Sequence, residues 1–166
     1  MIISMIVAKG KDSEIGLNNQ LLWNIPEDMK WFREKTTSKV VIMGSKTHMS
    51  IGKLLPNRVN VVLTRNKDFK PLDQDVLVYN NIHEILNDFK DEKELVVVGG
   101  ASIYKQFMPM TNRLYITEVK KSYIADTFFP EFDREVYKCF YKRKGSREGV
   151  EKLGADYYFR VYKKVD

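Results

Sequence analysis

The sequence has 166 residues, a length that fits one domain over residues 1–166 and leaves little room for a second. Hydrophobic residues make up 43% of it, aromatic residues 12% and charged residues 30%, which excludes a disordered chain or a fibrous repeat. The formal net charge of +6 is a moderate surplus that attracts phosphates or carboxylates without requiring nucleic acid.

The single cysteine, Cys139, excludes a disulfide within the chain and fits a reducing compartment. The apolar stretches are far shorter than the roughly 20 residues of a membrane span. The first residues also lack the basic region and long apolar core of a secretory signal. We therefore expect a cytoplasmic protein that does not bind a membrane.

Five short apolar runs are typical of strands. They are rich in valine and isoleucine and mostly continuous, as expected for strands covered on both faces of a largely parallel sheet. The runs are Ile2–Ala8, Val40–Met43, Val59–Leu63, Leu95–Val98 and Leu114–Thr117. The pattern between them favours helices over Pro26–Thr36, Ser45–Ile51, Ile82–Lys90 and Ala101–Met108. Pro26 suits a first helical position, because its fixed backbone angle already matches the helix.

Two segments rich in tyrosine and phenylalanine, Glu135–Arg143 and Asp156–Lys164, flank the polar stretch Lys144–Gly154. They predict an antiparallel strand pair at the sheet edge, with Cys139 and the aromatic side chains buried in packing. The polar segment Asn66–Asp75 is interpreted as a surface loop. The expected fold is a single-domain α/β structure. It has an eight-stranded, mostly parallel sheet, an antiparallel C-terminal strand pair and about four flanking helices.

Glycine turns follow two of the predicted strands and open into predicted helices. Gly99-Gly100-Ala101-Ser102 follows Val98, and Gly44-Ser45-Lys46-Thr47 follows Met43. Free amides at helix starts attract phosphate, and ligands of open α/β sheets gather at the carboxyl ends of the strands. Together with Thr64-Arg65 after Leu63, these turns indicate a site for a dinucleotide that carries an extra phosphate. The alternative is that they are only tight turns, because neither the Rossmann fingerprint nor a P-loop is present.

An acidic residue stands in an otherwise apolar helix start. Asp28 and Phe32 are four residues apart and share a helix face, close in sequence to Trp23 and Ile25. If Phe32 is buried, desolvation raises the pKa of the Asp28 carboxyl and makes it a candidate proton donor or an acceptor for a cationic heterocycle. The alternative is that Asp28 only complements the helix dipole.

Other reactive side chains indicate no further chemistry. His48, His83 and Cys139 lack the spacing of metal ligands, so we expect no metal site. The sequence also offers no arrangement of serine, histidine and aspartate, or of cysteine and histidine, that predicts a nucleophile.

Several short motifs, weak singly but specific in their joint order, resemble those of bacterial chromosomal dihydrofolate reductases from Met1 to about Val165. These motifs are Ile15-Gly16, Leu21-Leu22-Trp23-Asn24-Ile25-Pro26-Glu27-Asp28, Val41-Ile42-Met43-Gly44-Ser45-Lys46-Thr47, Ser50-Ile51-Gly52, Leu55-Pro56-Asn57-Arg58, Val98-Gly99-Gly100, Leu114-Tyr115-Ile116-Thr117 and Asp126-Thr127-Phe128-Phe129-Pro130.

The resemblance implies reduction of 7,8-dihydrofolate to 5,6,7,8-tetrahydrofolate, with hydride going to C6 and a proton to N5, in support of one-carbon and thymidylate metabolism. It assigns Asp28, Trp23 and Thr117 to catalysis, with Asp28 holding the pterin ring and Thr117 bonded to that acid. Arg58 is implied to pair with the glutamate carboxylate of the substrate, a partner suited to a bidentate guanidinium. The implied substrate-binding residues are Ile6, Val7, Asp28, Met29, Phe32, Ile51, Leu55, Arg58, Val98, Tyr104 and Thr117.

The resemblance also implies NADPH as the cofactor. Lys46 and Arg65 are then the expected contacts of its 2′-phosphate. The implied cofactor-binding residues are Val7, Ala8, Ile15, Gly16, Asn19, Leu21, Gly44, Ser45, Lys46, Thr47, Leu63, Thr64, Arg65, Gly99, Gly100, Ala101, Ser102, Ile103, Tyr104 and Thr127. Some residues depart from the family pattern, among them Leu22 in place of a usual proline and Ser45 in place of a usual arginine.

Two other functions fit parts of the pattern. One is a related nicotinamide reductase that acts on a pyrimidine of the riboflavin pathway, which the Trp23 to Asp28 motif and Arg58 disfavour. The other is a basic nucleic-acid-binding module, which predicts lysine and arginine clustered on one face, whereas here both signs of charge are interspersed. We therefore expect a monomer that binds dihydrofolate and antifolate inhibitors and has no nucleic-acid partner.

Overall fold

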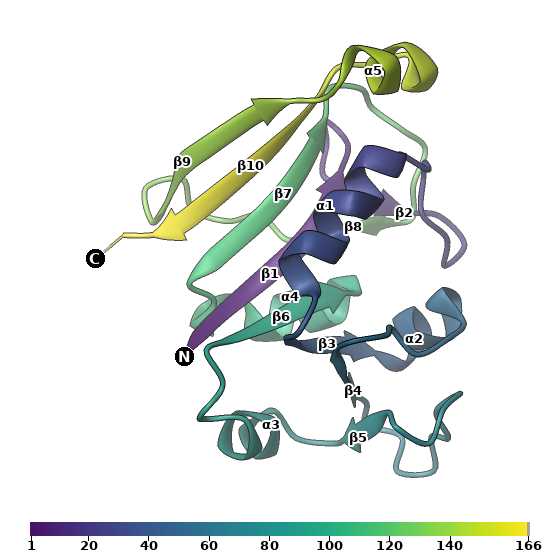
Figure 1. The fold of residues 1–166 in the computed structure, drawn as a ribbon, viewed down its shortest axis with the longest axis vertical. Helices are drawn as coiled ribbons and strands as arrows, with labels where there is room; N and C mark the ends of the chain where they lie inside the picture. The colour runs from purple at the N-terminus through teal and green to yellow at the C-terminus, as the bar shows by residue number, and fades with distance from the viewer. Residues whose placement is uncertain (166) are drawn as a thin grey trace.

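An eight-stranded sheet organises the chain (Figure 1), and the computed structural model describes residues 1–165. The strand order is β5-β4-β3-β6-β1-β7-β10-β9. The bounds of these strands are β1 Ile2–Lys9, β3 Val40–Gly44, β4 Val59–Leu63, β5 Leu77–Tyr79, β6 Glu94–Gly99, β7 Arg113–Val119, β9 Tyr137–Lys144 and β10 Tyr157–Lys164. Strands β5 to β7 of this order pair in parallel, and β10 is antiparallel to both β7 and β9.

The helices and a small second sheet complete the fold. The second sheet pairs β2 (Glu14–Gly16) with β8 (Thr127–Phe128). The helices are α1 Pro26–Thr36, α2 Ser45–Ile51, α3 Ile82–Asp88, α4 Ala101–Phe107 and α5 Arg147–Leu153, with a 3₁₀ turn at Met108–Met110. In Figure 1, α1 lies across one face of the sheet and α4 lies behind the other.

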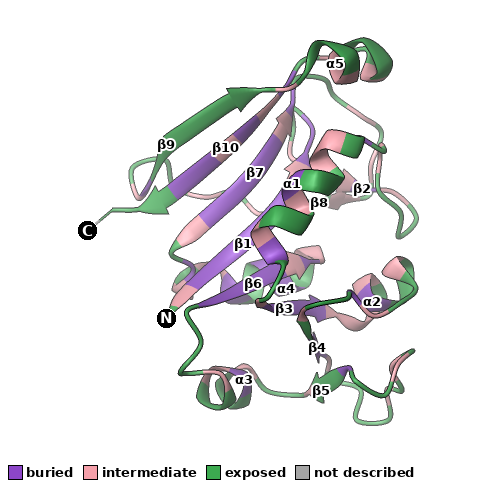
Figure 2. Cartoon of the chain, viewed as in Figure 1, coloured by how far each residue is buried: buried purple, intermediate pink, exposed green. Residues whose placement is uncertain are grey.

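The central strands are buried along almost their whole length (Figure 2). Val40–Met43 of β3 and Leu95–Val97 of β6 are fully covered. Continuous apolar runs are what a parallel strand needs, because helices cover both of its faces. The predicted fold class and the antiparallel C-terminal strand pair are therefore confirmed.

The connections create a crevice at the carboxyl ends of β1 and β6. From β1 the chain runs through α1 to β3, on one side of β1, whereas from β6 it runs through α4 to β7, on the other side. Such a reversal of direction leaves the two crossover connections diverging at the strand ends. The crevice is therefore where a ligand of this fold is expected.

Some predictions of local structure were wrong. The stretch Lys144–Gly154 contains α5, and the short strands β2, β5 and β8 were not anticipated. Cys139 is exposed rather than buried, as are Phe140 and Tyr141. The reason is that β9 is the last strand of the sheet, and only its first residue, Tyr137, reaches the core.

No helix within residues 1–165 is both long enough and apolar enough to span a membrane.

Candidate active site

Asp28 occupies the first turn of α1, where its carboxyl group lies against β7. Thr117 Oγ1 donates a hydrogen bond to Asp28 Oδ1 at 2.6 Å. Although part of the residue is exposed, protein atoms surround the carboxyl group, and desolvation raises its pKa to about 6. The Thr117 hydroxyl opposes this shift and the negative charge of Glu27 adds to it. The group is therefore mostly ionised at neutral pH and gains a proton readily just below it.

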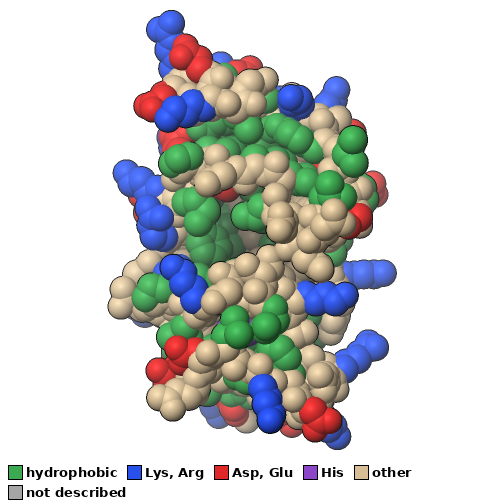
Figure 3. Space-filling model, turned by 90° about the vertical axis from the view of Figure 1, so that its right-hand side faces the viewer, with side chains coloured by type: hydrophobic (Ala, Val, Ile, Leu, Met, Phe, Trp, Pro, Cys, Tyr) green, Lys and Arg blue, Asp and Glu red, His purple; other side chains and the backbone are tan. Residues whose placement is uncertain are grey.

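Apolar side chains pack along the helix that carries this carboxyl. Phe32 and Val98 are half-buried, and each packs against two separate parts of the core. One part contains Ile6 and Ile25, and the other contains Leu55. The face at the carboxyl ends of the parallel strands is hollowed and lined by hydrophobic side chains (Figure 3). Phe32, which the spacing predicts on the same helix face as Asp28, is therefore partly buried, and the hollow suits a flat heterocycle.

The segment between β2 and α1 is tied to two neighbouring elements. Asp126 accepts a hydrogen bond from the Asn18 amide through Oδ2 at 3.0 Å and donates its own amide to the Gly16 carbonyl at 3.0 Å. Ser50 of α2 donates its hydroxyl to the Asn19 carbonyl at 2.6 Å. These bonds hold the segment against α2 and against the residue before β8.

The two predicted glycine turns lie side by side, because Met43 of β3 is paired with Gly99 of β6. Gly99 has φ of +128°, a conformation that glycine adopts without strain. The Gly99–Gly100 peptide is cis. A Cβ atom on Gly100 would lie 3.3 Å from Thr47 Oγ1, so the backbone passes close to α2. Glycine therefore leaves bare backbone at the starts of two helices.

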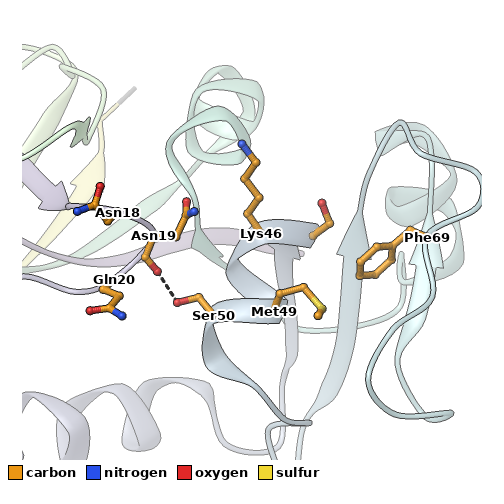
Figure 4. A pocket seen from close by; sticks show the side chains of 8 residues that line it. Asn18, Asn19, Gln20, Lys46, Met49, Ser50 and Phe69 are labelled. Carbon is orange, nitrogen blue, oxygen red and sulfur yellow. Dashed lines mark hydrogen bonds between the residues drawn. The ribbon is translucent and has the colours of Figure 1, made fainter.

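A cavity of about 420 Å³ opens beside these turns (Figure 4). It lies next to the start of α2 rather than next to Asp28. Figure 4 shows Lys46 and Met49 projecting from α2 and the Ser50 hydroxyl meeting the backbone of Asn19. The residues that line it are Asn18, Asn19, Gln20, Ser45, Lys46, Met49, Ser50 and Phe69. A lysine, several amides and two hydroxyls suit a phosphate-bearing ligand.

Tyr104 connects the two halves of the crevice. Its hydroxyl donates a hydrogen bond to the Ile6 carbonyl at 2.7 Å, and its ring is almost fully buried. Burial raises the pKa of this hydroxyl far above its ordinary value, so it remains a donor at any ordinary pH. The bond fixes the middle of β1 against α4.

Arg58 ends the turn that follows α2 and points toward the end of α1. Its Nη1 donates to Thr36 Oγ1 at 3.0 Å and its Nε donates to the Pro56 carbonyl at 2.8 Å. Buried Asn60 supports the turn, because its side chain bonds both the amide and the carbonyl of Leu55 at 2.9 Å. The remaining guanidinium donors are available to a carboxylate at the rim.

The structure places the predicted site residues in three groups. The first group belongs to α1 and the strands and connections packed near it and consists of Ile6, Trp23, Met29, Phe32, Ile51, Val98 and Thr117, with Leu55 and Arg58 on the turn that follows α2. The second group lies at the glycine turns and consists of Ala8, Gly44, Ser45, Lys46, Thr47, Thr64, Arg65, Gly99, Gly100, Ala101 and Ser102. The third group belongs to β2, the segment between β2 and α1, and β8, and consists of Ile15, Gly16, Asn19, Leu21 and Thr127. Val7, Leu63, Ile103 and Tyr104 instead belong mainly to the core.

The sequence reasoning missed several residues that support the site. Asn60 supports the turn of Arg58, and Ser50 and Asp126 hold the segment between β2 and α1. From the sequence, Glu27 was assigned no role at the site, although its side chain bonds to the C-terminal hairpin. The contacts of Ser50, Asp126 and Glu27 join residues 31 to 130 positions apart, and Asn60 is a single polar residue in its turn. No spacing pattern in the sequence therefore predicts them. Among residues 1–165, no group of histidine, cysteine and acidic side chains has the geometry of a metal site.

The fold and this site define the class of nucleotide-dependent α/β enzymes, here with a single desolvated carboxyl at the carboxyl ends of the strands. Comparison with known proteins narrows the class. The sequence profile of the family described as dihydrofolate reductase matches residues 2–164.

The relatives cover nearly the whole chain. A dihydrofolate reductase of Buchnera aphidicola subsp. Baizongia pistaciae is 39% identical over 99% of both chains. One from Bacillus subtilis is 36% identical over 98% of this chain and 95% of its own. The solved dihydrofolate reductase of Enterococcus faecalis, complexed with NADP(H) and RAB-propyl, has a TM-score of 0.89 and 30% identity, covering 99% of this chain and 97% of its own. The chain therefore belongs to the dihydrofolate reductase family.

Proposed function

We propose that this protein reduces 7,8-dihydrofolate to 5,6,7,8-tetrahydrofolate at the expense of NADPH. The observation that carries the proposal is the desolvated Asp28 carboxyl, bonded to Thr117, on the same side of the sheet as two glycine turns at helix starts. Family membership along residues 2–164 supports the same reaction. A single desolvated acid matches what the reduction of a C=N bond requires.

The reaction adds a hydride to C6 and a proton to N5. NADPH supplies the hydride when it is bound. The protein then has to hold the heterocycle in place, exclude water and keep a proton available at N5. No second carboxyl bonds to Thr117 or Asp28 in the described chain, so one proton is shared between Asp28, the heterocycle and solvent.

Asp28 carries the electrostatic part of the task. Its carboxylate accepts hydrogen bonds from the heterocycle and stabilises the cation that forms when N5 is protonated. Because the carboxyl has a pKa of about 6, the site holds this extra proton better at neutral pH than an exposed aspartate would. The rate is therefore expected to fall as the pH rises and the proton is lost.

The residues at the glycine turns fit the cofactor. A Cβ on Gly44 would meet Ile103 at 3.1 Å, and one on Gly100 would meet Thr47 at 3.3 Å, so the bare backbone is needed at both helix starts. We infer that Gly44–Thr47 and Gly99–Ser102 hold the pyrophosphate through backbone amides and hydroxyls. Lys46 and Arg65, both exposed, are the proposed contacts of the 2′-phosphate.

Several finer statements belong to the same proposal. Arg58 is proposed to bind the glutamate tail of the substrate, and antifolates are proposed to occupy the hollow beside Asp28. The Enterococcus relative, solved with NADP(H) and RAB-propyl, supports ligand binding in this fold. We also propose a cytoplasmic monomer without nucleic-acid or membrane partners, because a single chain supplies every group named above and its lone cysteine is a free thiol.

The test is NADPH oxidation, followed by absorbance with and without dihydrofolate. We predict dihydrofolate-dependent oxidation by the wild type, and loss of most of it at neutral pH in Asp28→Asn. Since Asn keeps the shape but cannot share the proton, NADPH binding and the fold should survive. Unfolding is expected to need more urea at pH 7 in this variant, because burying the ionised carboxyl costs stability above its unfolded pKa.

Two results would contradict the assignment. If Asp28→Asn retained wild-type kinetics, Asp28 would not carry the proton-handling role. If the wild type oxidised NADPH only with a pyrimidine of the riboflavin pathway, the substrate assignment would be wrong, although the site geometry would stand.

A further inference from the structure

Glu27, next to Asp28 in the first turn of α1, is bonded on all sides by the C-terminal hairpin. Its Oε1 accepts hydrogen bonds from the Ser146 amide at 2.9 Å and from the Tyr157 hydroxyl at 2.7 Å. Its Oε2 pairs with Arg143 Nη1 at 2.8 Å. A carboxylate that only complements the helix dipole needs no hydrogen-bond donors from other elements, whereas Glu27 has three.

This cluster fixes where α1 begins. The N-cap residue, Ile25, makes no side-chain capping bond, so the first turn lacks the usual local anchor. Glu27 supplies one instead, because it joins that turn to β9, to the residue before α5 and to β10. Asp28 follows directly in the same turn, so the anchor also sets the place of its carboxyl.

The cluster also places charge close to Asp28. The groups around the Asp28 carboxyl are the Thr117 hydroxyl from β7, the Glu27 carboxylate from α1 and the Tyr157 hydroxyl from β10, with Arg143 of β9 on the far side of Glu27. Glu27 raises the pKa of Asp28, as a like charge must. Burial raises the pKa of Tyr157 to about 12, so that hydroxyl stays neutral.

Solvent reaches the outer side of the cluster. A cavity of about 240 Å³ is lined by Glu27, Lys30, Trp31, Glu34 and Arg143. Burial opposes ionisation of Glu27, but the hydrogen bonds from Ser146, Tyr157 and Arg143 outweigh it and lower the pKa of Glu27. Glu27 therefore stays ionised across the pH range in which Asp28 gains its proton.

We propose that Glu27 is a positioning residue for the reaction, and that its ion pair with Arg143 sets the electrostatic field in which the Asp28 carboxyl holds its proton. The inference rests on the proposed function. Glu27 touches neither substrate nor cofactor and acts through Asp28. Its negative charge favours the protonated site, and the positive charge of Arg143 partly cancels that effect.

Two variants separate charge from structure. Glu27→Gln removes the negative charge but keeps an oxygen that accepts from Ser146 and Tyr157. Arg143→Gln removes the positive charge and leaves Glu27 ionised. Both variants break the same ion pair. If the role of the pair is purely structural, both variants should shift the pKa of Asp28 in the same direction. If the role is electrostatic, the two variants should shift that pKa in opposite directions.

The measurement is the titration of the Asp28 carboxyl by ¹³C NMR in the ligand-free protein, beside the pH profile of the NADPH-dependent reduction. In Glu27→Gln we expect the Asp28 midpoint to fall by roughly half a pH unit, a size that screened unit charges a few ångströms apart produce. The rate above the midpoint should fall about threefold with it, since half a pH unit is that factor in proton occupancy. In Arg143→Gln the midpoint should rise.

Glu34→Gln is the matched control, because Glu34 is an exposed carboxylate of the same helix that lines the same cavity two turns further on. It should leave the midpoint unchanged. Shifts of the same sign in Glu27→Gln and Arg143→Gln, or an equal shift in Glu34→Gln, would overturn the inference. The NMR titration does not need turnover, so a failure of the proposed reaction would appear separately, as a wild type that does not reduce dihydrofolate.

Discussion

At the scale of single residues, the site depends on how one carboxyl is solvated. The spacing of Asp28 and Phe32 predicted a desolvated carboxyl if Phe32 is buried; in the structure Phe32 is half-buried and the carboxyl is desolvated. Thr117 comes from 89 residues away and meets Asp28 only because β7 lies beside β1. No periodicity along the chain predicts such a contact, so the Thr117–Asp28 bond was expected only from the resemblance to the family.

Replacing Thr117 tests how its hydroxyl acts on Asp28. In Thr117→Val the carboxylate loses a 2.6 Å hydrogen bond that lowers its pKa. The Asp28 midpoint should therefore rise, by roughly one pH unit, because a hydrogen bond to a charged group is worth roughly 1.5–3 kcal/mol. The pH profile of dihydrofolate reduction should move toward alkaline pH by the same amount.

Thr117→Ser is the control, since it keeps the donor and removes only a methyl group. Its pH profile should stay close to that of the wild type. If the valine and serine variants shifted alike, packing rather than the hydrogen bond would determine the pKa of Asp28.

At the scale of elements, the buried parallel strands were predictable because both of their faces must be apolar. The turns Gly44-Ser45 and Gly99-Gly100 were also found, since glycine at a strand end has few other uses. By contrast, α5 was missed although Ser146 caps its start and Gly154 ends it in the left-handed conformation. Most of its residues are polar and exposed, and Val150 and Leu153 alone pack against the core, too few to give the apolar periodicity that indicates a helix.

The prediction that Cys139 is buried was wrong because its strand lies at the edge of the sheet. An apolar or aromatic residue in a strand is buried only if something covers that strand. β9 has a neighbour on one side alone, and all its residues after Tyr137 are exposed. The order of the strands in the sheet determines which strand lies at the edge, and the local residue pattern does not predict that order.

The turn between α2 and β4 offers a prediction about substrate choice. Arg58 is fixed there by bonds to the Pro56 carbonyl and to Thr36, so its guanidinium is ordered before any ligand arrives. In Arg58→Leu the Michaelis constant for dihydrofolate should rise at least about tenfold, because a charge-assisted bidentate contact is worth more than about 1.4 kcal/mol.

The same variant should change little for a dihydropterin that lacks the glutamate tail. Steady-state kinetics with both substrates makes the comparison. An equal rise for the two substrates would remove Arg58 from the tail site and assign it to the fold alone.

At the scale of the whole molecule, the two ends of the sheet carry different tasks. The carboxyl ends of the strands hold the proposed site, while the opposite ends hold a polar cluster around Glu94. Ser4 donates to Glu94 at 2.6 Å and Tyr115 at 2.8 Å, and Lys39 pairs with it at 2.7 Å. This cluster joins β1, β6, β7 and the residue before β3, so it secures the sheet far from the chemistry.

The Glu94 cluster predicts how stability depends on pH. Desolvation opposes ionisation of Glu94, but the bonds from Lys39, Ser4 and Tyr115 outweigh it and lower its pKa in the folded protein. A lowered carboxyl pKa stabilises the fold above the unfolded value of about 4.3, and this stability disappears as the pH falls through the folded pKa. Glu94→Gln should therefore cost roughly 1–3 kcal/mol of unfolding free energy at pH 7 and progressively less below about pH 4.

Urea unfolding of the wild type and of Glu94→Gln at several pH values measures this difference. Glu92→Gln, which changes an exposed carboxylate two residues earlier, should cost little at any pH. Because the cluster lies at the opposite end of β1 and β6 from Asp28, the midpoint of the Asp28 titration should stay unchanged in Glu94→Gln. If the loss of stability persisted undiminished below the pKa of Glu94 in the folded protein, packing of this side chain, and not its charge, would join β1, β6, β7 and the residue before β3.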